Sequence, residues 1–81
     1  MKIIKINEKD NPAVALENLK CGERIGDLTL LQDIPMGHKL ALCDIKKGEK
    51  VIKYGYPIGS AAEDIKRGSH IHTHNLKSDV A

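Results

Sequence analysis

The stretch "ALCDIKKGEKVI", Ala41 to Ile52, decides how this chain folds, because the sequence contains it more than once. It recurs twenty residues later as "AAEDIKRGSHIH", Ala61 to His72. An earlier and more divergent copy is "VALENLKCGERI", Val14 to Ile25. Self-similarity of this kind indicates a repeated supersecondary unit. We therefore expect one short structural element to occur three times in the 81 residues.

Each copy has the pattern of a strand, a turn and a second strand. An apolar stretch is followed by an Asp or Asn, an aliphatic residue, two further residues, a Gly and another apolar stretch. Short aliphatic runs bounded in this way are typical of β-strands. The Gly supplies the positive φ that a turn needs, and Asn18, Asp44 and Asp64 can cap the turn by accepting hydrogen bonds from backbone N–H groups. The sequence thus predicts a mostly β fold.

The predicted architecture is a single small domain over residues 1–81, with a core too small to enclose a large active site. Because open sheet edges invite aggregation, we expect the strands to close into a barrel or clip. The segments "QDIPMG" and "YGYPIG", each with Pro and Gly, are predicted loops. The predicted strands are 2–6, 13–17, 23–31, 38–43, 50–54, 57–63 and 69–75.

The composition indicates an aliphatic core and a weak net charge. The chain has no Phe or Trp, and Tyr54 and Tyr56 are its two tyrosines. Thirteen basic and eleven acidic residues give a formal net charge of +2, and acids are interspersed among the lysines. Nucleic-acid binders usually gather basic charge on one face, often with aromatic residues for stacking. We therefore predict no nucleic-acid partner.

The sequence also bears on the location of the protein. No apolar run approaches the roughly 18 residues of a membrane span. The start, "MKIIKINEKDN", has neither the apolar segment nor the cleavage site of a signal peptide. Cys21 and Cys43 lie in no CxxC motif, so we interpret them as free thiols in a reducing compartment. We predict a cytoplasmic protein without membrane contact.

The stretch "GSHIHTHN" places three of the four histidines at alternate positions. In a strand, His70, His72 and His74 would share one face while Ile71 points to the other. Two imidazoles one step apart can converge on one metal ion, whereas His70 and His74 would lie about 13 Å apart, too far to share one. We expect a histidine pair completed by carboxylates, by His38 or by another chain. A solvent-exposed polar strand is the alternative.

Three further residues are candidates for a site. His38 follows a Pro-Gly loop at the start of a predicted strand, where functional residues are common, although a solvated loop histidine fits this position equally well. Lys39 beside it is either a surface charge or a substrate contact. Asn75 follows the histidines and has an amide that can bond a sugar hydroxyl.

The segment from Ile34 to Asn75 closely resembles the N-terminal module of the altronate/galactarate dehydratase family. The resemblance rests on "GHKLAL", "VIKYGYPIG" and "HIHTHN" in this order, and it is looser over the first 33 residues. It implies a SAF domain of the β-clip fold. In some organisms this module is a separate small subunit, so the implied partner is a large altronate-dehydratase-like catalytic subunit.

Members of this family remove water from sugar acids such as altronate or galactarate, with a divalent metal as Lewis acid. The resemblance implies that this chain is the small subunit of such a hydro-lyase and is inactive alone. Fe(II) or Mn(II) is the expected metal, and Zn(II) also suits imidazole ligands. Elimination of water needs a base for the proton α to the carboxylate, a cation for the enediolate and an acid for the hydroxide.

The residue roles implied by the resemblance remain hypotheses, and ligand and general-base roles stay open for each histidine. A related enzyme that removes sulfite from sulfolactate has a similar small subunit and is the nearest alternative. A non-catalytic SAF module that binds a carbohydrate or a protein is another, and we also consider a homo-oligomer. The candidates are His38 and His72 as catalytic residues, Lys39 and Asn75 as substrate contacts, and His70, His72 and His74 as metal ligands.

Overall fold

The computed structural model describes residues 2–5 and 7–78. Within these residues every regular element is a strand, which confirms the predicted mostly β fold class. The described part of the chain accordingly has no helix long and apolar enough to cross a membrane. The strands are β1 (Ile3–Ile4), β2 (Pro12–Ala15), β3 (Arg24–Ile25), β4 (Leu28–Thr29), β5 (Lys39–Ala41), β6 (Lys50–Lys53), β7 (Tyr56–Ala61), β8 (His70–Ile71) and β9 (Leu76–Lys77).

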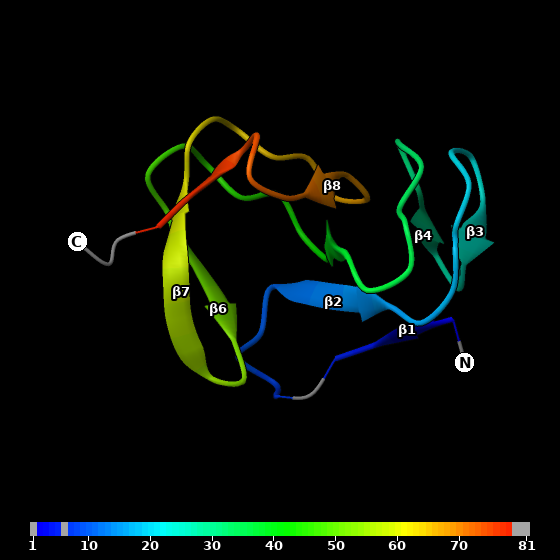
Figure 1. The fold of residues 1–81 in the computed structure, drawn as a ribbon, viewed down its shortest axis with the longest axis horizontal. Coiled ribbons are helices and arrows are strands. Elements are labelled where there is room, and N and C mark those ends of the chain that lie inside the picture. Colours follow the sequence, from blue (N-terminus) through cyan, green and yellow to red (C-terminus); the bar gives the residue numbers. More distant parts are fainter. Residues whose placement is uncertain (1, 6, 79–81) are drawn as a thin grey trace.

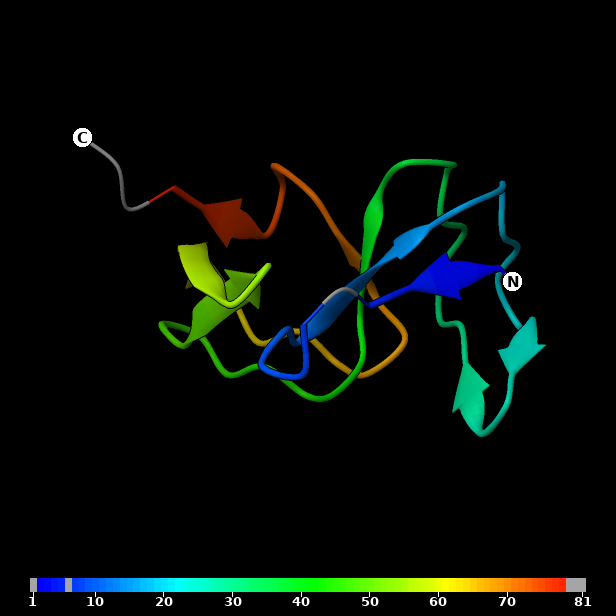
Figure 2. The same ribbon diagram turned by 90° about the horizontal axis from the view of Figure 1, so that it is seen from below.

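The strands of the described residues form three small antiparallel sheets. A four-stranded sheet has the order β1-β2-β5-β8, β3 and β4 form a hairpin, and β6, β7 and β9 form the third sheet. Figures 1 and 2 show the β3–β4 and β6–β7 hairpins at opposite ends of the molecule, with the four-stranded sheet between them. Strands distant in sequence are thus brought together in the middle.

Four copies of one turn unit, rather than the predicted three, connect these strands. In each unit the glycine has a φ of 85–89°, and the next residue donates its N–H to the carbonyl three residues before it, as Glu23 does to Lys20 at 3.0 Å. This is the hydrogen bond of a type II turn, whose third position requires a positive φ. In the unpredicted copy Pro35 and His38 replace Lys20 and Glu23. The units span residues 16–23, 31–38, 42–49 and 62–69.

The turn units associate in pairs, and the two members of a pair cap each other. Asp44 of the third unit accepts a hydrogen bond from the N–H of Arg67 in the fourth unit at 2.8 Å. Asp64 of the fourth unit accepts one from Lys47 in the third unit, also at 2.8 Å. Between these caps the buried aliphatic residues of the two units exchange two backbone hydrogen bonds of 2.7 Å. The prediction that Asp and Asn cap turns is correct, but each caps the turn of its partner.

The first and second units repeat this arrangement. Asn18 accepts a hydrogen bond from the N–H of Met36 at 2.9 Å, and Asp33 accepts one from Cys21 at 2.8 Å. A side-chain hydrogen bond that satisfies a turn contributes about 0.5–1.5 kcal/mol. Four such bonds are a substantial stabilisation for a domain of this size.

Two apolar clusters lie beneath the two pairs of units. Leu40 and Ala41, adjacent residues of β5, are both fully buried but belong to different clusters, so β5 is shared by the two halves. The cores are aliphatic, as the composition predicts. The first cluster comprises Ala13, Ala15, Leu19, Leu28, Leu30, Ile34 and Leu40, and the second comprises Ala41, Ile45, Val51, Ala61, Ile65 and Ile71.

Several predicted boundaries are corrected by the structure. The predicted strand 23–31 is a hairpin, because Gly26 has a φ of 61° and reverses the chain between β3 and β4. The predicted strand 2–6 contains β1, and its residue 6 lies outside the described residues. The predicted loop "YGYPIG" is a turn only at Tyr54 and Gly55, since the rest belongs to β7. The short strand β9 was not predicted.

We predict that Gly68→Ala is more destabilising than Gly48→Ala. The two glycines have φ values of 89° and 87°, a conformation that costs other residues roughly 1–3 kcal/mol. A Cβ at Gly48 would meet nothing within 4 Å, whereas one at Gly68 would overlap the carbonyl oxygen of Thr29 in β4. Urea denaturation should therefore give a clearly larger loss of unfolding free energy for Gly68→Ala. Equal losses would mean that the fourth unit does not pack closely on β4.

The β6–β7 hairpin is held at its tip by a buried carboxylate. Asp10 is only 5% exposed. Its Oδ1 accepts a hydrogen bond from the N–H of Gly55 at 2.8 Å, and its Oδ2 accepts one from the N–H of Asn7 at 3.2 Å. Burial by itself raises the pKa of Asp10, but hydrogen bonds from backbone N–H groups outweigh burial and leave this pKa below its ordinary value.

We predict that Asp10→Asn lowers stability in a pH-dependent way. Because the folded-state pKa is the lower one, the stabilisation by the carboxylate is complete above the ordinary pKa of about 3.9 and is lost as the pH falls through the folded-state value. Denaturation curves should show the largest difference in unfolding free energy from wild type above about pH 5. Glu8→Gln, which removes an exposed carboxylate nearby, is the control. A difference independent of pH would contradict the assignment.

Candidate metal centre

Strand pairing brings histidines from two distant segments together. β5 pairs antiparallel with β8, with Lys39 opposite Ile71. Continuing this register by one residue sets His38, at the end of the second turn unit, opposite His72. Their rings are stacked with centroids 4.3 Å apart and planes at 17°. The ring of His70 also stacks with both, at 5.0 Å from His38 and 5.6 Å from His72.

The three rings have nitrogens close enough to one another to bind one metal ion. The ligand atoms of His38, His70 and His72 all lie within 4.8 Å of one another, and His38 Nδ1 lies 2.8 Å from His70 Nε2. Nitrogens bound to one ion at about 2.1 Å are roughly 3.0–3.4 Å apart. The nitrogens of His38 and His70 already lie near this spacing, and a bound ion would replace the hydrogen bond between them. All three residues are partly buried.

The prediction of one extended strand over residues 69–75 is wrong beyond Ile71. Residues 72–75 form a turn, and Leu76 donates its N–H to the carbonyl of His72 at 2.9 Å. The turn brings the ring of His74 to 5.4 Å from that of His70, whereas a straight strand would separate these residues by about 13 Å. His74 does not belong to the group with close nitrogens, and its role as a ligand stays a prediction.

Asn75 shapes this turn from a buried position, with 4% of its surface exposed. Its Oδ1 accepts a hydrogen bond from the N–H of His72 at 3.0 Å, and its Nδ2 donates one to the carbonyl of His70 at 2.8 Å. One amide thus fixes the backbone on both sides of Ile71 and sets the spacing of two rings. The contact of Asn75 with a substrate hydroxyl stays a prediction, and the geometry gives it a positioning role.

Gln32 also supports the cluster, and the sequence analysis missed it. Its Oε1 accepts a hydrogen bond from the N–H of His70 at 2.8 Å. Gln32 belongs to the same turn unit as His38, so this unit supplies one ring of the cluster and holds the backbone of another. Aligning "LQDIPMGH" with the other units would have pointed to this segment, but not to the contact itself.

Electrostatics keep two of the rings uncharged near neutral pH. Burial lowers the pKa of His70, and the positive charges of His38 and other neighbours lower it further. Burial and then His38 also lower the pKa of His72, with a contribution from Lys39. Since the ordinary histidine pKa is about 6.5, both rings are mainly neutral at pH 7. Neutral imidazole is the form that binds a metal or accepts a proton.

The arrangement favours an anionic ligand. Among the described residues, the group with close nitrogens contains three imidazoles and no carboxylate. A divalent ion held by neutral ligands would keep its full charge, so an anion would complete its coordination. Lys39 is partly buried next to the rings, and burial followed by the charge of Lys53 lowers its pKa. The donor set suits Fe(II), Mn(II) or Zn(II) without distinguishing them.

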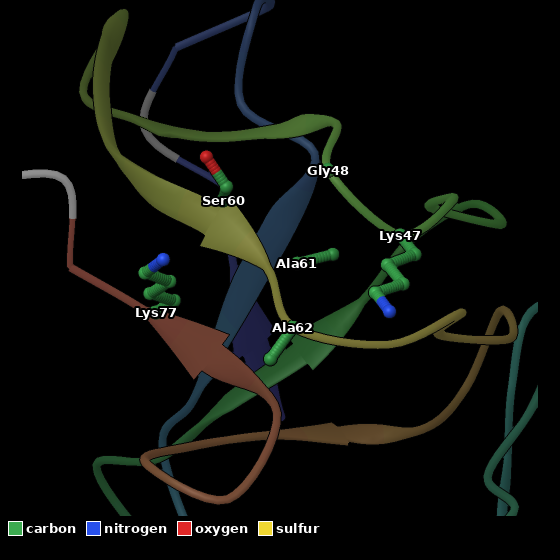
Figure 3. A pocket seen from close by; sticks show the side chains of 6 residues that line it. All are labelled: Lys47, Gly48, Ser60, Ala61, Ala62 and Lys77. Atoms are coloured by element: carbon green, nitrogen blue, oxygen red, sulfur yellow. The ribbon is translucent and has the colours of Figure 1, made fainter.

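A separate depression of ≈ 400 Å³ includes residues of β7 and β9 in its lining, and no histidine lines it. Figure 3 shows Lys47 and Lys77 on opposite sides of the view with Ala61 between them, and Ser60 of β7 on the side of Lys77. These side chains are not typical ligands of transition metals. The candidate centre is therefore the histidine cluster rather than this depression.

The fold and the cluster define a small all-β domain, built from paired turn units, that presents grouped imidazoles at one sheet edge. The chain belongs to the altronate/galactarate dehydratase SAF domain family, whose sequence pattern matches residues 1–79. Family membership confirms the resemblance seen in the sequence.

Individual relatives fall into two groups by length. The altronate dehydratase of Escherichia coli (strain K12) is 48% identical over 85 residues, which cover 100% of this chain but 17% of that enzyme. The altronate dehydratase of Bacillus subtilis (strain 168) is 43% identical over 82 residues, which cover 96% of this chain and 16% of that enzyme. The (2R)-sulfolactate sulfo-lyase subunit alpha of Chromohalobacter salexigens is 36% identical over 75 residues, with 80% of each chain covered. This chain therefore spans only a small part of the dehydratases.

We predict that Asn75→Ala destabilises the chain and disorders the histidine turn. Removing the amide takes away the partner of the N–H of His72 and of the carbonyl of His70, both in partly buried residues, and a lost hydrogen bond of this kind costs about 0.5–1.5 kcal/mol. Chemical denaturation should show this loss, and the ring resonances of His70 and His72 should shift in NMR spectra. Thr73→Ala, at an exposed position of the same turn, should change neither. If Asn75→Ala behaves like Thr73→Ala, the positioning role is wrong.

Proposed function

We propose that this chain is the small subunit of a sugar-acid hydro-lyase that acts with a separate large catalytic subunit. The observation that carries the proposal is the convergence of three imidazole nitrogens within 4.8 Å in a member of this dehydratase family. The chain corresponds to 17% of the E. coli altronate dehydratase. This supports a larger partner that completes the site, and an isolated chain that is inactive.

We infer that His38, His70 and His72 hold a divalent metal, with Fe(II) or Mn(II) expected and Zn(II) also compatible. When bound, the ion would supply Lewis-acid stabilisation of the enediolate. A nitrogen that binds the ion cannot also carry a proton, so the exposed His74 is the free imidazole of the group. Asn75 and Gln32 keep the ligand-bearing backbone in place.

Dehydration of a hydroxy acid removes a proton α to the carboxylate and a hydroxide from the next carbon, which leave together as water. A neutral imidazole can take the proton and return it to the departing hydroxide near neutral pH. We expect the ammonium of Lys39 to pair with the substrate carboxylate. Burial of Lys39 strengthens that pairing, because solvent screens a partly buried charge less.

A sulfolactate sulfo-lyase small subunit is the second candidate. The observation that favours it is the relative in Chromohalobacter salexigens, a subunit by name, which matches this chain over 80% of both lengths. The two reactions share removal of the proton α to the carboxylate and differ in the leaving group, which is sulfite rather than hydroxide. The same cluster could therefore serve either reaction.

We predict that the isolated chain binds one divalent ion through the three close nitrogens. Titration with Co(II) or Zn(II), followed by absorption spectroscopy or calorimetry, should give one site. Loss of a residue that merely orients a metal ligand lowers metal affinity by roughly 10–100-fold. We expect a loss of affinity at least as large for each of the three ligand variants, His38→Ala, His70→Ala and His72→Ala. His74→Ala, the matched control, should lower metal affinity less. Equal binding by all four variants would refute the metal centre.

The enzymatic half of the proposal is tested in a chimera. This chain replaces the matching segment of the E. coli altronate dehydratase, and turnover of altronate, galactarate and sulfolactate is measured with Fe(II) or Mn(II). We expect one of these acids to be consumed, and His72→Ala to abolish turnover. Turnover that is unchanged in His38→Ala and His72→Ala would show that the cluster has no part in the reaction.

A further inference from the structure

The two tyrosines of the chain are displayed to solvent at the tip of the β6–β7 hairpin. Tyr54 is 51% exposed and Tyr56 is 74% exposed. Neither ring belongs to one of the two apolar clusters. In a chain without Phe or Trp, these are the two largest aromatic side chains, and the fold leaves both of them exposed.

The tip that carries these rings is strained and held in place. Tyr54 has a φ of 55° and is the only non-glycine residue with a positive φ among the described residues. Gly55 has a φ of 79°, and a Cβ there would lie 2.9 Å from Nδ2 of Asn7, so a side chain at this position would strain the backbone and displace the side chain of Asn7. The buried carboxylate of Asp10 accepts the hydrogen bond from the N–H of Gly55. This hydrogen bond ties the hairpin tip to the segment that carries Asp10.

Tyr54 and Gly55 form the two-residue loop between the paired residues Lys53 and Tyr56, and both have a positive φ, as a type I′ turn requires. The turn explains the backbone conformation, but not why a tyrosine stands where Asn, Asp or Gly is the usual residue. Backbone strain persists only where the surroundings enforce it, and it gathers at binding and active sites. Exposed aromatic residues are the commonest energetic anchors of protein interfaces. An anchor fixed in its bound conformation also loses little entropy on binding. The geometry at Tyr54 and Tyr56 is that of a preorganised anchor.

We propose that the tip formed by residues 53–56 docks into an apolar recess, edged by carboxylates, on the large catalytic subunit. This inference rests on the proposed function for its partner. The acidic edge follows from the charges beside the rings, because the ammonium of Lys53 lies 5.0 Å from the centroid of the Tyr54 ring. The nearby carboxylate of Asp10 is buried and already bonded, so it does not pair with that charge.

The charges also argue against a second copy of this chain as the occupant. Two tips brought together would place Lys53 of one copy near Lys53 of the other, and like charges disfavour such a contact. A large catalytic subunit is the better candidate. The segment that matches this chain is 17% of the E. coli altronate dehydratase, and the rest of that enzyme corresponds to such a subunit.

A second exposed apolar group serves as an internal comparison. Leu16, Leu31 and Met36 are 43%, 46% and 65% exposed on the first pair of turn units. None of these three residues has a positive φ, in contrast to Tyr54. If the docking surface were chosen by apolar exposure alone, this group would be covered as readily as the tyrosines.

Hydroxyl-radical footprinting of the chimera tests the proposal directly. Labelling of Tyr54, Tyr56 and Met36 is measured by mass spectrometry in the isolated chain and in the E. coli altronate dehydratase that carries this chain. We expect labelling of both tyrosines to fall by roughly fivefold or more in the chimera, as for anchors at the centre of an interface. Labelling of Met36 should change little.

Several outcomes would overturn the inference. Tyrosines that stay as reactive in the chimera as in the isolated chain would exclude docking through the tip, and protection of Met36 alone would assign docking to the other apolar group. Protection of the tyrosines that rises with the concentration of the isolated chain would identify a second copy. Protection of the isolated chain by added galactarate would identify a sugar acid instead.

Variants of the isolated chain provide a test that does not depend on the chimera. Asn tolerates a positive φ better than Tyr, so Tyr54→Asn should keep or raise the midpoint temperature of unfolding. Tyr56→Ser should leave it unchanged, whereas Asp10→Ala should lower it. If either tyrosine variant lowers the midpoint as much as Asp10→Ala does, the rings stabilise the fold and the proposal fails.

The chimera also separates this inference from the proposed function. In the chimera, Tyr56→Ser should restore the labelling of Tyr54 to its level in the isolated chain, and Met36→Ser should not. A chimera that turns over a sugar acid while its tyrosines stay reactive would reject the docking surface and keep the function. Protected tyrosines in a chimera that consumes none of the three acids would keep the docking surface and reject the function.

Discussion

The reciprocal hydrogen bonds between paired turn units are the constraint on which this structure depends. Asp44 and Asp64 each reach across to satisfy the turn of the other unit, so neither unit is complete without its partner. The exchange fixes strand pairing over a long sequence separation without a large core or a disulfide, since both cysteines are free and exposed. His38 ends the second unit and His70 directly follows the fourth. The hydrogen bonds within each pair of units therefore position both residues where the next strand begins.

The fold class could be predicted because glycine and Asp or Asn recur at fixed spacing. The second unit was overlooked because Pro35 and His38 stand where the first and third units have Lys and Glu, which made the segment resemble an isolated loop. The choice of partner for each cap is a tertiary contact that no local pattern encodes. The strand predicted over 69–75 failed for a similar reason, since the buried amide of Asn75 closes a turn that residue alternation cannot reveal.

The residues of the candidate site could be predicted better than their arrangement in space. Spacing alone grouped the histidines of the last segment, and the sequence offered His38 as one means of completing the set. The pairing register decides that His38 lies opposite His72, and this register comes from the folded sheet. Gln32 gave no signal, because a single backbone contact to His70 is its whole contribution to the cluster. The cytoplasmic location, the lack of a nucleic-acid partner and self-association stay predictions.

The sharing of β5 between the two halves has a consequence for how the molecule comes apart. Leu40 and Ala41 are consecutive residues that complete different apolar clusters. Pulling this strand from one cluster therefore displaces it from the other. Domains of this size usually unfold in one cooperative transition, and here the cooperativity has a specific origin. We therefore expect local opening of either half to be suppressed, so that His38, which immediately precedes β5, is held by the stability of the whole domain rather than by that of its own half.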